Sequence, residues 1–265
     1  MRVAISQFGA SRTIAENTAR IVSDAHRAGE AGASLMVCPE ASMIRLPDKD
    51  ESLVGRVEPV EGSFGTGLAL ASEETGVTIV AGGFTPGDAS RVKNTLFVAS
   101  GGRIIATYDK IHLYDAFSDK ESDKVLAGPV EPVTVDVEGV RIGLATCYDL
   151  RFPELFRDLA DRGSLLVAVP TAWVKGPLKE EHWLTLLRAR AIENSFFIVG
   201  SGEAGVRSIG RSAAFDPMGL QLTDLGAGDG FGVVDMDIGK VAETRRANPS
   251  VHNRRYAVLP RSGDE

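Results

Sequence analysis

Short runs of apolar residues alternate along the chain with longer stretches in which apolar residues recur at helical spacing. Residues 3–8 form the first such run, and residues 13–28 follow with Ile14, Ile21 and Ala25 on one helical face. A short apolar run predicts a buried strand, whereas spacing by three or four residues predicts an amphipathic helix. Further strands are expected at residues 34–38, 77–82, 94–99, 103–108, 140–146, 165–169, 196–200, 212–215 and 231–236, and further helices at residues 64–75, 153–162 and 180–194.

Strands that alternate with helices are typical of an α/β protein, in which helices cover apolar strands. Gly101 and Gly102 separate two of the expected strands, and a glycine pair in that position predicts a hairpin. We therefore expect mixed sheets rather than purely parallel ones.

One domain over residues 1–265 is expected, because no linker rich in Pro, Gly and Ser divides the chain. Residues from about 240 on are rich in arginine and are expected to form an extended C-terminal surface tail. At 43% hydrophobic residues, a chain of 265 residues can bury a substantial core.

The N-terminus enters its first apolar run at Val3, without the basic start and cleavage site of a signal peptide. No stretch approaches the roughly 18 consecutive apolar residues that a membrane span needs. These features favour a soluble cytoplasmic protein without membrane contact.

Charge and residue counts exclude several kinds of site. The net charge is −7 with dispersed acidic residues, which argues against a nucleic-acid partner. The four histidines are scattered and the two cysteines, Cys38 and Cys147, lie far apart, so no metal site is expected. A disulfide between them is possible on numbers alone, but a chain with this core does not need one.

Candidate chemistry lies just after three of the expected strands. Glu40 follows residues 34–38, Lys110 follows residues 103–108, and Cys147 follows residues 140–146. Ligands bind at the carboxyl ends of strands in α/β sheets, so neighbouring strands would bring a carboxylate, an ammonium and a thiol together. A thiol with a pKa of about 8.5 needs a base at neutral pH. The carboxylate can supply that base, and the ammonium can hold an oxyanion.

Other readings of these residues remain open at this point. A cysteine at a strand end is commonly a buried small hydrophobe, as Cys38 is expected to be. A Cys–His hydrolase would use His112 or His182 as base, but Ala145 and Asp149 stand where a nucleophile elbow has glycines.

Three longer motifs resemble those of the nitrilase superfamily, the carbon–nitrogen hydrolases that use a Glu-Lys-Cys triad. The run VCPE ends at Glu40, YDKIHL contains Lys110, and CYDLRFPEL begins at Cys147. Their order matches that of the family, and the likeness extends over nearly the whole chain. It implies an α-β-β-α sandwich with two mixed sheets between helical layers. It also implies no metal or cofactor, and assembly into homodimers or larger homo-oligomers.

The resemblance also implies roles for residues near the triad. Glu121 is matched to a second glutamate of the family, with a charged surface loop as its alternative. Independently of the resemblance, the turn that leads into the helix expected at residues 153–162 offers the backbone N–H of Tyr148 as a second oxyanion donor. Arg151, Thr171 and Trp173 are candidates for the substrate pocket, although Arg151 could equally be a structural partner of Asp149 or Glu154.

The residues that follow Cys147 indicate which branch of the superfamily the chain resembles. Tyr148 and Asp149 stand where true nitrilases have Trp and Glu, which is closer to omega-amidases and deaminated glutathione amidases. Their likeness implies a small amide substrate that carries a carboxylate, hydrolysed to an acid and ammonia through a thioester. An N-carbamoyl amino acid hydrolase with the same triad and a non-catalytic binding module are the alternatives.

Overall fold

The computed structural model describes residues 1–46, 52–117 and 119–259. Its α-helices are α1 (Ile14–Glu30), α2 (Ser63–Thr75), α3 (Pro153–Asp161), α4 (Lys179–Asn194) and α5 (Gly239–Ala247), with short 3-10 helices η1 (Glu121–Asp123) and η2 (Cys147–Arg151). The strands are β1 (Arg2–Gln7), β2 (Leu35–Val37), β3 (Thr78–Pro86), β4 (Val92–Ser100), β5 (Arg103–Asp109), β6 (Val125–Leu126), β7 (Thr134–Val137), β8 (Val140–Leu144), β9 (Leu166–Thr171), β10 (Phe197–Gly202), β11 (Ala213–Phe215), β12 (Gln221–Asp224) and β13 (Gly230–Asp235).

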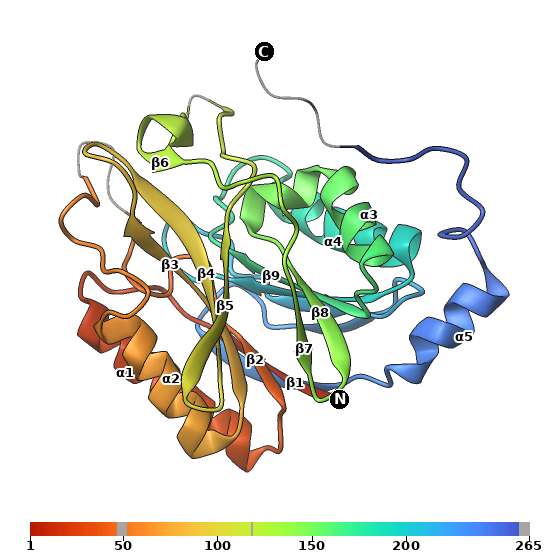
Figure 1. The fold of residues 1–265 in the computed structure, drawn as a ribbon, viewed down its shortest axis with the longest axis horizontal. Coiled ribbons are helices and arrows are strands. Elements are labelled where there is room, and N and C mark those ends of the chain that lie inside the picture. The colour runs from red at the N-terminus through yellow and green to blue at the C-terminus, as the bar shows by residue number, and fades with distance from the viewer. Residues whose placement is uncertain (47–51, 118, 260–265) are drawn as a thin grey trace.

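Two sheets form the centre of the molecule (Figure 1). The first has the order β13-β1-β2-β3-β4-β5 with β6 paired to β4, and the second has the order β12-β11-β10-β9-β8-β7. Both sheets are mixed: β1, β2 and β3 are parallel, as are β8, β9 and β10, and antiparallel strands flank them. The hairpin predicted at Gly101 and Gly102 is confirmed, since β4 and β5 pair across it.

The layers follow from the alternation of side chains along each strand. In β1, Val3 and Ile5 point into the core between the two sheets, whereas Ala4 packs against the helices on the other side. Helices α1 and α2 cover the first sheet, and α3 and α4 cover the second (Figure 1). This arrangement confirms the expected sandwich of two mixed sheets between helical layers.

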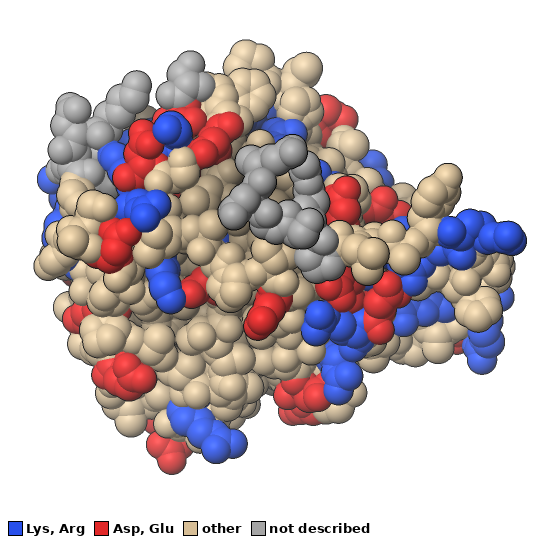
Figure 2. Space-filling view, turned by 45° about the horizontal axis from the view of Figure 1, so that its top comes forward, with Lys and Arg blue, Asp and Glu red and all other residues tan. Residues whose placement is uncertain are grey.

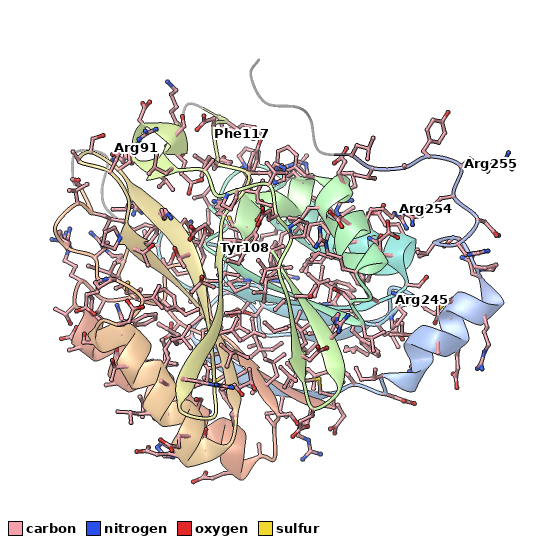
Figure 3. All side chains as sticks on the ribbon, viewed as in Figure 1. Arg91, Tyr108, Phe117, Arg245, Arg254 and Arg255 are labelled. Carbon is pink, nitrogen blue, oxygen red and sulfur yellow. The ribbon has the colours of Figure 1, made fainter. Side chains whose placement is uncertain are left out.

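The C-terminal segment differs from the extended tail expected from the sequence. Residues Gly239–Ala247 form α5, in which Val241 is buried against the inter-sheet core. Arg245 reaches back from this helix to the carbonyl oxygens of Ser164 and Asn194 (Figure 3). Helix α5 is therefore held to the body of the protein by Val241 and Arg245, and only the residues after it lack regular structure up to residue 259.

Charges of both signs are mixed over the face shown in Figure 2, and basic groups gather at the edge near α5 and the chain after it. Within residues 1–46, 52–117 and 119–259, no helix is long and apolar enough to cross a membrane.

Candidate active site

The residues singled out from the sequence meet at the carboxyl ends of strands from both sheets. Glu40 lies three residues after β2, Lys110 directly after β5, and Cys147 three residues after β8. Glycines let these segments pack closely. A Cβ on Gly82 would lie 2.0 Å from the Glu40 carbonyl oxygen, and one on Gly128 would lie 2.2 Å from the Asp109 carbonyl oxygen. Larger residues there would displace Glu40 or Lys110.

Glu40 and Lys110 form a buried ion pair. The Lys110 ammonium donates to Glu40 Oε1 at 3.1 Å, and the side-chain exposures are 2% and 4% for the lysine and the glutamate. The Nδ2 of Asn94 donates to the same oxygen at 2.8 Å, and the backbone N–H of Ala172 donates to Oε2 at 2.8 Å. These bonds fix both oxygens of the carboxylate in position.

Glu121 is the second carboxylate on Lys110. The ammonium lies 2.9 Å and 3.1 Å from its two oxygens, and the Tyr114 N–H donates to Oε2 at 2.6 Å. Burial alone would lower the pKa of Lys110, but Glu121 and Glu40 raise it well above its usual value. Lys110 therefore carries a fixed positive charge, and Glu121 is part of the cluster rather than of a solvated loop.

Cys147 begins η2 with a φ of 46°, a left-handed conformation that is uncommon for residues other than glycine. The turn is built on Asp149, which is fully buried. Its carboxylate accepts hydrogen bonds from the Thr146 N–H at 2.9 Å, the Tyr108 hydroxyl at 2.6 Å and the His112 N–H at 3.0 Å. Figure 3 shows Tyr108 in the interior. Asp149 thus ties the cysteine turn to the segment that carries Lys110.

The thiol of Cys147 is partly buried and faces the other charges. Burial and the nearby Glu40 carboxylate raise its pKa above the usual value, while Lys110 and the Thr171 hydroxyl lower it. The net effect keeps the thiol protonated at neutral pH, so its proton must leave as attack proceeds.

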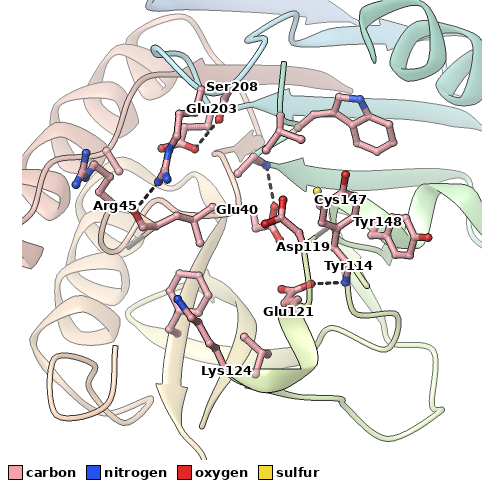
Figure 4. Close-up of a pocket in the computed structure, with 18 of the residues that line it drawn as sticks. Glu40, Arg45, Tyr114, Asp119, Glu121, Lys124, Cys147, Tyr148, Glu203 and Ser208 are labelled. Atoms are coloured by element: carbon pink, nitrogen blue, oxygen red, sulfur yellow. Dashed lines mark hydrogen bonds between the residues drawn. The ribbon is translucent and has the colours of Figure 1, made fainter. Parts of the chain in front are cut away.

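A cavity of about 880 Å³ opens onto this cluster. Its lining includes Glu40, Lys110, Glu121, Cys147 and Tyr148, and Figure 4 shows Glu121, Tyr114 and Cys147 together on one side. Tyr148 is the second residue of η2, and N–H groups in a first helical turn have no intrahelical acceptor. Its N–H is thus available near the thiol.

Only one of the three other residues predicted for the substrate pocket lines the cavity. Trp173 lines the cavity, but Arg151 and Thr171 do not. Thr171 is fully buried, and Arg151 lies behind the wall, 5.1 Å from the Trp173 ring and 3.5 Å from His182 Nδ1. The Asp149 carboxylate is bound by other groups, so Arg151 is not its partner.

Neither histidine proposed for a Cys–His pair lines the cavity. His112 Nδ1 lies 2.7 Å from Asp149 Oδ1, and its ring stacks on Phe152 at 3.7 Å between centroids. His182 contacts Arg151 on the far side of the wall. The carboxylates are therefore the bases that face the thiol.

Glu203 is a further acid in the cavity wall that the sequence did not single out. It directly follows β10, is 7% exposed and accepts a hydrogen bond from the Ser208 hydroxyl at 3.0 Å (Figure 4). Burial raises its pKa to about 7; the Ser208 hydrogen bond opposes this shift, and the negative charge of Glu40 adds to it.

The raised pKa of Glu203 predicts that stability falls as pH rises. Between its ordinary pKa of 4.5 and about 7, the folded protein keeps the proton that the unfolded chain has lost. The unfolded state then binds fewer protons, so the free energy of unfolding decreases by about 3 kcal/mol across this range. Urea unfolding from pH 4 to 8 should show this decrease in wild type and lose it in Glu203→Gln. The exposed Glu243→Gln is the control, and an unchanged slope in Glu203→Gln would contradict the assignment.

Two helix-covered sheets thus bring a thiol, two carboxylates and an ammonium together at one cavity, and these are groups that a thiol-dependent hydrolysis requires. A family model described as carbon-nitrogen hydrolase matches residues 2–246. The chain therefore belongs to the carbon–nitrogen hydrolase family, and within it to the amidase type.

Individual relatives extend over nearly the whole chain. A deaminated glutathione amidase of Escherichia coli O157:H7 is 38% identical, with 97% of this chain and 98% of that protein covered. The human deaminated glutathione amidase is 30% identical, with 96% and 82% covered. A mutant form of the amidase of Nesterenkonia sp. AN1, with acrylamide added at its active-site cysteine, superposes with a TM-score of 0.83 at 27% identity and 96% coverage of both chains. A carbon–nitrogen hydrolase superfamily protein of Xanthomonas campestris shares the fold, with a TM-score of 0.87, 24% identity and 98% and 99% covered.

Proposed function

We propose that the protein hydrolyses a small, carboxylate-bearing amide to an acid and ammonia through a thioester on Cys147. The observation that carries the proposal is the buried ion pair of Glu40 and Lys110 at a cavity that also exposes the Cys147 thiol. The names of the relatives support amide hydrolysis, and the deaminated glutathione amidases support an anionic substrate.

In the first half of the reaction, Glu40 takes the thiol proton as sulfur attacks the amide carbonyl. The Lys110 ammonium stabilises the developing oxyanion by its positive charge, and the Tyr148 N–H stabilises it by donating a hydrogen bond. Glu40 then returns the proton to the leaving nitrogen, so ammonia departs and the acyl group remains on sulfur.

In the second half, Glu40 removes a proton from water as the water attacks the thioester. The acid leaves and the proton returns to the thiol, which restores the starting state. The hydrogen bonds from Ala172 and Asn94 keep the carboxylate in place for both transfers, and Glu121 holds the Lys110 ammonium.

The test is ammonia release from a panel of small amides, ureido acids and nitriles. We expect the protein to release ammonia from amides faster than the uncatalysed reaction does. Amides of one chain length should be hydrolysed best. Ammonia together with carbon dioxide from ureido acids alone would assign a carbamoylase instead. A folded protein that releases no ammonia from any member would contradict the proposal and leave a binding module.

A further inference from the structure

Lys179 is a buried lysine in the cavity wall that the triad does not use. It is 6% exposed and begins α4, where its ammonium donates to the Tyr114 hydroxyl at 3.0 Å. Three aromatic rings surround it, with centroids 4.2 Å away for Phe117, 5.1 Å for Tyr114 and 5.9 Å for Trp173. Figure 3 shows where Phe117 lies.

The surroundings of Lys179 leave its charge without an anion. An ammonium has three donors, and here a neutral phenol takes one of them. Among the described residues no carboxylate lies within 4.0 Å of its Nζ, whereas Lys110 has two. A buried charge is costly unless it is paired, and a cation at the first residue of a helix also opposes the helix dipole. Cation–π contacts with the three rings offset part of this cost, but no anion of the described residues neutralises the charge.

Two residues, Tyr114 and Trp173, connect Lys179 to the reacting groups. Tyr114, whose hydroxyl accepts from Lys179, also donates its N–H to Glu121. Trp173 follows Ala172, whose N–H binds Glu40. Lys179, Tyr114, Trp173 and Cys147 all line the same cavity.

The charges that line the cavity favour one orientation of an anionic amide. Glu40 and Glu121 outnumber Lys110, so the reacting centre is net negative and disfavours a substrate carboxylate. Lys179 attracts that carboxylate. The other cations that line the cavity already have partners of their own: Arg207 donates to the Leu46 carbonyl oxygen at 2.9 Å, Lys120 pairs with Asp123 at 3.1 Å, and Arg45 and Lys124 are engaged as well.

Resting on the amidase function proposed above, we propose that Lys179 and the Tyr114 hydroxyl form the subsite for the substrate carboxylate. A substrate of the kind proposed above would then bind with its scissile amide at Cys147 and its carboxylate at Lys179. The buried ring of Trp173 covers one side of this ion pair, and a less hydrated environment strengthens it.

The experiment compares succinamate, glutaramate and adipamate, each beside the neutral amide in which an isopropyl group replaces the carboxylate. Wild type should prefer the best anionic amide by at least roughly tenfold in kcat/KM. Lys179→Met should raise KM for that amide roughly 10- to 100-fold, the effect of one charged hydrogen bond, with kcat nearly unchanged. The neutral amides should be hydrolysed as before, and Lys179→Arg should restore much of the affinity. The exposed Lys175→Met serves as the matched control.

Wild-type enzyme without a preference for the anionic member would overturn the subsite, and this result needs no variant to fold. Equal loss on anionic and neutral amides in Lys179→Met, or no loss on either, would also overturn it. In each of these cases Cys147-dependent hydrolysis of the neutral amides leaves the proposed function standing. Failure of the function itself would instead show as no hydrolysis of any amide by wild type.

Discussion

Cys147→Ala is expected to lower kcat/KM for amide hydrolysis by at least about four orders of magnitude. No other group at the site can form the thioester, so both half-reactions are lost together, and removal of a nucleophile is costly for this reason. The protein should still fold, because alanine fits the partly buried position and Asp149 retains its hydrogen bonds. Ammonia release by purified wild type and variant, with circular dichroism as a check on folding, measures the effect.

Cys38→Ala is the matched control for the nucleophile. Cys38 is the only other cysteine, and it is fully buried between the first sheet and its helices. Burial raises its pKa far above the usual value, so its thiol is inert. We expect the activity of this variant to stay within about twofold of wild type. Activity of Cys147→Ala above about 1% of wild type would contradict the role assigned to Cys147.

Glu40→Gln is expected to lower kcat by about 10³- to 10⁴-fold, at the upper end of the range for a general base because Glu40 acts in both half-reactions. The amide also fits the site badly. Both oxygens of Glu40 accept hydrogen bonds, from Lys110 and Asn94 on one side and from Ala172 on the other. Either orientation of the glutamine amide places an NH₂ group against a donor, so Lys110 loses part of its fixed position.

The pH dependence distinguishes loss of the base from misfolding. In Glu40→Gln, residual activity should rise with pH as the thiol ionises without help, whereas a misfolded variant would show no such rise. Glu121→Gln is the comparison, since it keeps the base and instead changes the carboxylate that binds Lys110 and accepts from the Tyr114 N–H. A loss on Glu121→Gln larger than that on Glu40→Gln would reverse the assignment of the base.

Much of the fold followed from hydrophobic patterning, because buried strands and amphipathic helices leave clear periods. The hairpin at Gly101 and Gly102, the helix that became α4, and the strand ends that carry Glu40, Lys110 and Cys147 were all predicted in place. Short elements were missed. Thr134–Val137 and Gln221–Asp224 form β7 and β12, which are edge strands of only four residues and too short for their pattern to stand out. Helix α5 was missed because its docking depends on Val241 alone among its apolar side chains.

The candidate site was also predicted only in part from the sequence. Residue types at strand ends and the family motifs brought the triad together, but neighbours from distant segments decide the other roles. Asp149 is structural because Tyr108 and His112 reach it from about 40 residues away. Lys179 reads as an ordinary surface lysine in sequence, and only the fold encloses it with Tyr114 and Phe117. Glu203 likewise comes to line the cavity only because β10 lies beside β9.

The acyl group on Cys147 is the most direct measure of the mechanism. Wild-type enzyme mixed with a small amide and quenched in acid within milliseconds should gain the mass of the acyl group without the nitrogen, as seen by intact mass spectrometry. Peptide mapping should place the gain on Cys147, and hydroxylamine should convert it to a hydroxamate. Ammonia released at full rate with no adduct and no hydroxamate, or an adduct on Cys38, would contradict the thioester mechanism.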